Sequence, residues 1–174
     1  FSTPADLAGK PGWAGKNNAV ALAYAKAIGV SPVKVGASGV FPSLKEGKLE
    51  VVPASAMSAV AFQWNTKLKY MTASNFNIIV GGSIISKKKL NELSAADQKT
   101  LLDTAKRAAG KLDQIVARDD ARAYQTLLGR GITAVDTSAN QAAWDAAAKK
   151  AREQLVQSGV YSKSLLKAVE AAAK

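Results

Sequence analysis

Few residues of this sequence have the type and spacing that catalysis requires. The 174 residues include no histidine and no cysteine, which removes the commonest general base, the thiolate nucleophile and the usual transition-metal ligands. The glycines and lysines of Gly9–Lys16 lack the spacing of a phosphate-binding Walker loop. Ser83 and Ser86 have no neighbouring base. We therefore expect no catalytic residue, no metal site, no cofactor and no enzyme activity.

The charge balance leaves two interpretations open. Lys and Arg number 24 and Asp and Glu 13, giving a net charge of +11, which suits either a lysine-rich solvated surface or an anionic partner such as nucleic acid. The basic residues are spread along the chain rather than interleaved with aromatics, which disfavours recognition of single-stranded nucleic acid.

Hydrophobic residues make up 48% of the sequence, as in globular proteins. No apolar run is long enough to span a membrane and no signal peptide precedes Phe1, so we expect a removed signal or a start inside a longer protein.

The first half of the sequence alternates predicted helices and strands. Apolar residues recur with helical spacing over 17–28, and Gly29 follows as a stop signal. We then predict a strand over 33–35, a helix from a Ser38 cap to Leu44, a strand over 49–52, and a helix from Ala54 or Ser55 to about residue 65. This order predicts βαβ units with parallel strands and helices on both faces.

The second half is expected to contain a long buried strand and a long helix. The Ile- and Val-rich run 77–86, with Gly81–Gly82 inside it, predicts the strand, and 87–91 a short helix. Ser94 as N-cap and Asp97 in the first turn begin a helix to about Leu128. A strand over 132–135 and helices over 136–157 and 162–173 follow. The buried stripe of the long helix is predicted to comprise Leu101, Leu102, Ala105, Ala108, Ala109, Leu112, Ile115 and Val116.

Several short stretches occur in an order that resembles the DctP family of TRAP-transporter solute receptors. The stretches are Asp6–Lys10, Ala27–Val33, Ser43–Glu50, Lys69–Thr72, Ile84–Lys88 and Leu93–Lys99. No single stretch is specific, but their order and spacing cover the chain from Thr3 to the last helix. Members of this family are periplasmic receptors whose two lobes close on a ligand.

The resemblance implies an α/β receptor lobe with βαβ units, a long hinge-crossing strand and a long helix packing across the back. Residues 1–76 correspond to a second-lobe α/β ligand-binding segment, 77–131 to the hinge-crossing strand and long helix, and 132–174 to a short strand and C-terminal helices. It also implies that an N-terminal segment building most of the first lobe is missing, so the remaining surface should expose apolar residues unless a partner covers them.

The family's ligand-binding positions map onto Trp13, Ala37, Pro53, Ala54, Ser55 and Asn75. Trp13 stands where the family usually has an arginine that binds the ligand carboxylate, and an indole cannot replace a guanidinium fork. Trp13 is either an apolar wall of the site or a packing residue. Ala54 replaces a usual asparagine and Ala37 an aromatic residue, whereas Asn75 is kept. Lys10 or Lys16 could supply a point charge. Phe62, Trp64 and Tyr70 either line or back the pocket or pack in the core, and core packing is the expected role of each.

These departures resemble a subgroup of receptors that works with a tetratricopeptide-repeat protein. They predict a ligand less dependent on a carboxylate than the family norm, with hydrophobic character. The expected partners are this small molecule, the TRAP membrane permease subunits, the tetratricopeptide-repeat protein and the missing lobe, in the periplasm and without nucleic acid. The alternative is a basic helical protein that binds nucleic acid or another anionic partner, and it rests on the net charge alone.

Overall fold

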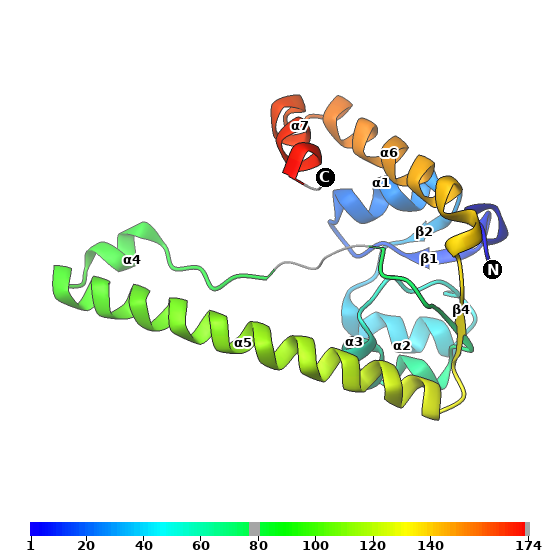
Figure 1. The fold of residues 1–174 in the computed structure, drawn as a ribbon, viewed down its shortest axis with the longest axis horizontal. Helices are drawn as coiled ribbons and strands as arrows, with labels where there is room; N and C mark the ends of the chain where they lie inside the picture. Colours follow the sequence, from blue (N-terminus) through cyan, green and yellow to red (C-terminus); the bar gives the residue numbers. More distant parts are fainter. Residues whose placement is uncertain (77–80, 173–174) are drawn as a thin grey trace.

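The computed structural model describes residues 1–76 and 81–172 and has two small parallel sheets with helices around them. One long helix and the segment before it extend away from this body (Figure 1). The helices are α1 (Ala19–Ala27), α2 (Ala37–Lys45), α3 (Ala56–Ala61), α4 (Lys87–Asn91), α5 (Ala95–Gly129), α6 (Gln141–Gln157) and α7 (Lys163–Ala172). The strands are β1 (Pro11–Trp13), β2 (Ser31–Val33), β3 (Tyr70–Thr72) and β4 (Thr133–Val135), and the 3-10 helices are η1 (Pro4–Leu7), η2 (Trp64–Thr66) and η3 (Ser138–Asn140).

Strand β1 is the centre of the first sheet. It pairs in parallel with β2, and Gly12 forms a parallel bridge with Val51. The predicted parallel βαβ arrangement is therefore confirmed, but its strands are shifted. The strand predicted over 33–35 forms over Ser31–Val33, and the one predicted over 49–52 contributes only the bridge at Val51. Strand β1 was not predicted, because Pro11 and Gly12 are residue types that strands disfavour.

Two apolar clusters hold this body together. One packs α1 against α6 around Trp144, whose indole donates to the Ser2 carbonyl at 3.0 Å. The other lies under α2 and η2 around Trp64, which is only 1% exposed. The first of these clusters therefore packs the N-terminal part of the chain against the C-terminal part. The three-part division at residues 76 and 131 stays a prediction.

The predicted helices form, with small changes at their ends. Ser55 caps α3, and Ser94 caps α5 by accepting from the Asp97 amide at 3.2 Å. Ser38 is not a cap, since α2 begins one residue earlier and Gly36 occupies the cap position without a side-chain bond. The helix predicted over 136–157 begins later, as α6 at Gln141, after the short helix η3.

The predicted burial of the α5 stripe is wrong for this chain. Leu101, Leu102, Leu112, Ile115 and Val116 are all between 39% and 57% exposed. Only the last part of α5 reaches the body, where Ala123 and Leu127 are buried and the helix packs against α3. The periodicity correctly identified the helix and its apolar face. Burial also requires a second surface that covers this face, and within residues 1–76 and 81–172 none covers its first half.

The long buried strand expected over 77–86 is not formed by the part that the structure describes. Residues 81–86 have no strand assignment, and the Ile84 side chain is 98% exposed. Residues 77–80 lie outside the described residues. A strand requires a neighbouring strand to bond its backbone, and 81–86 pair with none among the described residues.

Gly12 provides a test of the first sheet. A Cβ at this position would overlap the Val30 side chain and lie 3.5 Å from the Val51 Cβ. We expect Gly12→Ala to lower the free energy of unfolding by about 1–3 kcal/mol, the usual cost of overpacking. Urea unfolding followed by circular dichroism measures this change.

The matched control is Gly110→Ala in α5, where an added Cβ meets no atom within 4 Å. Alanine there should raise the stability, or the helicity of α5, since glycine costs about 0.5–1 kcal/mol inside a helix. Equal stability of the Gly12→Ala protein and the parent would contradict the packing described for β1.

Candidate functional site

Most of the predicted ligand-binding residues follow the carboxyl ends of adjacent parallel segments of the first sheet. Trp13 is the last residue of β1, and Ala37 begins α2 after β2. Residues 53–55 follow the Val51 bridge and lead into α3. The structure thus places these residues along one edge of the sheet, which is where ligands usually bind in parallel α/β sheets. We refer to Trp13, Ala37, Pro53, Ala54 and Ser55 as the strand-end site.

Trp13 is held in a fixed orientation by its neighbours. Its indole nitrogen donates to the Val35 carbonyl at 2.8 Å. Its ring meets Trp64 edge-on, with centroids 5.4 Å apart, and Trp64 in turn stacks on Phe62 at 5.0 Å. The side chain is half-buried. Trp13 therefore has a packing role, and its single N–H donor is already used.

The polar groups of the strand-end site are mainly backbone amides. Ser55 accepts from the Ser58 amide at 3.1 Å and donates to the Ser58 hydroxyl at 3.0 Å, so its hydroxyl is occupied as a helix cap. Gly36 caps α2 without a side-chain bond, which leaves the first amides of that helix to other acceptors. Ala37 and Ala54 are exposed and contribute no polar side-chain atom.

The two candidate lysines lie at opposite ends of β1. Lys10 precedes the strand and forms an ion pair with Glu50 at 2.9 Å. Glu50 therefore balances the charge of Lys10, which lies at the amino end of β1, opposite the strand-end site. Lys16 follows Trp13, and its side chain lies 3.8 Å from the place where a Cβ on Gly36 would be. Of the two, only Lys16 can bring a cation to the strand-end site.

Asn75 is not part of the first sheet. It follows the carboxyl end of β3, whose neighbour is β4, and its side chain is exposed. The next residue, Phe76, packs against Trp144 with ring centroids 4.8 Å apart. Among the aromatic residues expected in the core, Trp64 is buried, but Phe62 and Tyr70 are 52% and 57% exposed. Burial of these last two was therefore wrongly expected.

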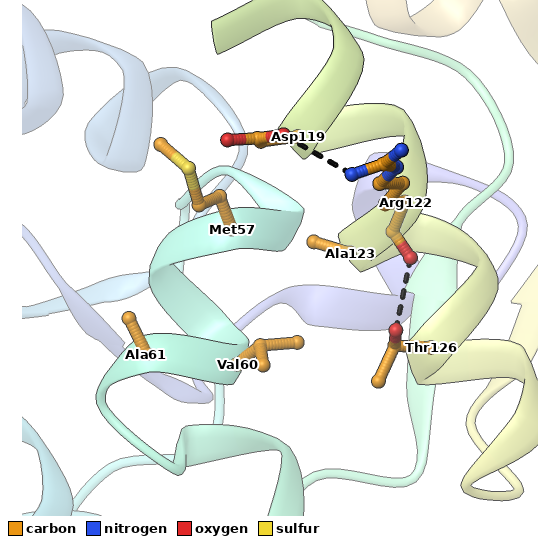
Figure 2. A pocket seen from close by; sticks show the side chains of 7 residues that line it. All are labelled: Met57, Val60, Ala61, Asp119, Arg122, Ala123 and Thr126. Atoms are coloured by element: carbon orange, nitrogen blue, oxygen red, sulfur yellow. Dashed lines mark hydrogen bonds and ion pairs between the residues drawn. The ribbon is translucent and has the colours of Figure 1, made fainter. Parts of the chain in front are cut away.

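An open depression of about 360 Å³ lies elsewhere, between α3 and α5 (Figure 2). Met57, Val60 and Ala61 line it from α3, and Asp119, Arg122, Ala123 and Thr126 from α5. It includes none of the predicted ligand-binding residues. Sequence reasoning could not locate it, because it depends on where the two helices meet. On its α5 side, the Asp119 carboxylate lies 4.0 Å from the Arg122 guanidinium, one turn along the same helix.

Two further features bear on the kind of protein. Within residues 1–76 and 81–172, no group of three or more acidic side chains is placed to hold a metal ion. In the same part of the chain, no helix is both long and apolar enough to cross a membrane.

Comparison with known proteins identifies a family. The model of the bacterial extracellular solute-binding protein family 7, DctP, matches residues 2–158. A solute-binding protein of Verminephrobacter eiseniae is 24% identical over 119 residues, which are 68% of this chain and 36% of that protein.

Solved structures agree in fold. A TRAP periplasmic solute binding protein from Chromohalobacter salexigens with bound D-glucuronate has a TM-score of 0.83 at 17% identity, covering 99% of this chain and 56% of that one. One from Desulfovibrio salexigens with bound orotic acid has a TM-score of 0.81 at 17% identity, covering 98% and 55%. One from Citrobacter koseri with bound D-glucuronate has 0.79 at 22%, also covering 98% and 55%. The chain spans about half the length of these structures, and it belongs to the DctP family of bacterial extracellular solute-binding proteins.

Proposed function

We propose that this chain is the ligand-binding portion of a periplasmic receptor that captures a small molecule and delivers it to a TRAP-type membrane permease. The observation that carries the proposal is the strand-end site, where three parallel segments end together beside the N-termini of α2 and α3. Loops and helix N-termini at such an edge present backbone amides to a ligand. The family match supports the same function.

Binding in such a receptor involves no covalent step. The ligand favours a closed arrangement of two lobes because it contacts both of them, and closure shifts the population of receptors. In this chain, Trp13 packs edge-on against Trp64, which in turn stacks on Phe62, and this aromatic packing makes one wall of the site rigid before binding. A rigid wall lowers the entropy that is lost when the ligand is ordered.

We further propose that the ligand depends little on a carboxylate. Structural relatives carry bound D-glucuronate, succinate or orotic acid, all of which contain a carboxylate. Here the side chain at the position of the family's usual arginine is Trp13, and Val35 already accepts its only donor. Lys16 could contribute a point charge but not a bidentate contact. An apolar ligand with one or two hydrogen-bonding groups fits this set of residues better.

The expected partners follow from the family. A receptor of this kind requires permease subunits to receive the ligand, and the departures at Trp13, Ala37 and Ala54, which resemble the subgroup described above, add a tetratricopeptide-repeat protein as a second partner. The nucleic-acid alternative rests only on the net charge of +11. The structural relatives named above carry bound organic acids, not nucleic acid.

A ligand screen on the receptor expressed from its complete reading frame tests the proposed specificity. In thermal-shift and calorimetric measurements, apolar ligands should raise the melting temperature and bind more tightly than succinate or D-glucuronate. Introducing a guanidinium by Trp13→Arg should increase the affinity for succinate by about tenfold, the value of a modest charge-assisted contact.

The control for added charge is Ala8→Arg, since Ala8 is exposed and precedes β1, at the opposite end of this strand from Trp13. It should leave succinate binding unchanged. Tight succinate binding by the parent receptor, with apolar ligands ignored, would overturn the proposed ligand class.

Trp13→Phe separates the two roles of this side chain. Phenylalanine keeps an aromatic ring but loses the hydrogen bond to the Val35 carbonyl, so the free energy of unfolding should fall by about 1 kcal/mol. The smaller ring also packs less well, which should lower the free energy of unfolding further. Affinity for the apolar ligands found in the screen should change by less than about threefold, since those ligands do not use the N–H. Trp64→Ala should be far more damaging, costing about 3–5 kcal/mol. Urea titration and calorimetry measure both quantities.

A further inference from the structure

The first turn of α3 is capped by a carboxylate that comes from α5. The Met57 amide donates to an Asp120 oxygen at 3.0 Å, and the two residues are 63 positions apart in the sequence. Figure 2 shows Met57 at the start of α3, beside this part of α5. The next amide, that of Ser58, donates to the Ser55 hydroxyl at 3.1 Å. Two backbone donors at the start of α3 are therefore already used by acceptors of the chain itself.

The charge of Asp120 is not balanced by a neighbouring cation. Within residues 1–76 and 81–172, no ion pair involves Asp120, whereas the adjacent Asp119 lies 2.9 Å from Arg118 and 4.0 Å from Arg122. Asp120 is half-buried, and a partly buried charge is screened less by salt than one on the open surface. The structure thus holds an unbalanced negative charge against the start of α3.

This charge lies on the side of α3 that faces the strand-end site. Met57 is two residues after Ser55, which is the last residue of that site. The first N–H groups of a helix point away from its body, toward the residues that precede it. The acceptor of the Met57 amide therefore lies on the side of residues 53–55. A ligand that contacts residues 53–55 approaches the Asp120 carboxylate.

Lys16 is the cation that could offset this charge, and it does so weakly. Its side chain lies beside the start of α2, 3.8 Å from the place where a Cβ on Gly36 would be, and the residue is exposed. An exposed ammonium on a flexible stem is strongly hydrated and well screened. Asp120, in contrast, is half-buried and held by its hydrogen bond to Met57. The negative charge therefore dominates near residues 53–55.

We propose that Asp120 determines specificity at the strand-end site by repelling anionic ligands, so that the receptor selects a neutral molecule. The inference rests on the proposed function and deepens it. Replacement of the family's usual arginine by Trp13 only removes an attraction for a carboxylate, whereas Asp120 adds a repulsion. Specific sites commonly combine both devices. The ligand class that fits is a neutral, largely apolar molecule whose polar groups are hydroxyls or amides.

Asp120→Asn tests the charge while keeping the hydrogen bond, because the amide oxygen of asparagine still accepts from the Met57 amide. The probes are succinate and its neutral diamide, succinamide, titrated calorimetrically into the receptor expressed from its complete reading frame. We expect the variant to bind succinate about three- to tenfold more tightly than the parent, with succinamide changed by less than about twofold. The gain for succinate should shrink as sodium chloride is added.

The matched control is Asp113→Asn. Asp113 is exposed on nearly the same side of α5 as Asp120, two turns or roughly 10 Å farther from α3. It removes the same charge and should change both affinities by less than about twofold. Asp120→Glu keeps the charge and should bind succinate as weakly as the parent. An equal gain for succinate in the two asparagine variants would show a general effect of net charge and would overturn the proposal.

Two other results would also overturn it. Unchanged succinate affinity in Asp120→Asn would show that the charge does not act on the ligand. Loss of affinity for both probes, with an altered circular dichroism spectrum, would leave Asp120 with a structural role alone. A failure of the proposed ligand class is read separately, from tight succinate binding by the parent. A parent that prefers apolar ligands, with no gain in Asp120→Asn, would contradict only the role of Asp120.

Discussion

The backbone pairing of β1 is the constraint on which the candidate site depends. This three-residue strand bonds β2 on one side and the Val51 segment on the other, so three chain segments end at one edge. Gly12 makes that approach possible, because a side chain there would overlap Val30. The bond from Trp13 to the Val35 carbonyl, at 2.8 Å, then ties the end of β1 to the segment that follows β2. The same few residues therefore determine both the sheet and the wall of the site.

Local patterns predicted the helices better than the strands. The Ser94 cap and the long apolar period identified α5, and Gly29 correctly marked the end of α1. Strand β1 escaped prediction because its residues Pro11 and Gly12 are unusual in strands, and are tolerated here by position and by close packing. The candidate site followed from family resemblance, not from periodicity. The engagement of the Trp13 indole with Val35 could not be foreseen, since it joins residues 22 positions apart.

Burial was the property that the sequence predicted least well. The α5 stripe was expected to be covered, and most of it is exposed, because within the described residues the main packing partner of this helix is α3, near its C-terminal end. An amphipathic pattern reports which face of a helix avoids water, but not which molecule covers that face. The same reasoning applies to Ile84, whose exposed side chain lies in a run that predicted a buried strand. These mismatches agree with a chain that corresponds to about half of its structural relatives.

The central claim, ligand binding at the strand ends beside Trp13, is tested most directly by nuclear magnetic resonance of the indole N–H groups. The chain has three tryptophans, and each gives one such signal. The Trp144 indole bonds Ser2 in the other cluster and serves as an internal control. Adding an apolar ligand from the screen to the complete receptor should shift the Trp13 signal strongly and leave that of Trp144 nearly unchanged. A shift of Trp144 alone, or no shift of Trp13 at saturating ligand, would contradict the account.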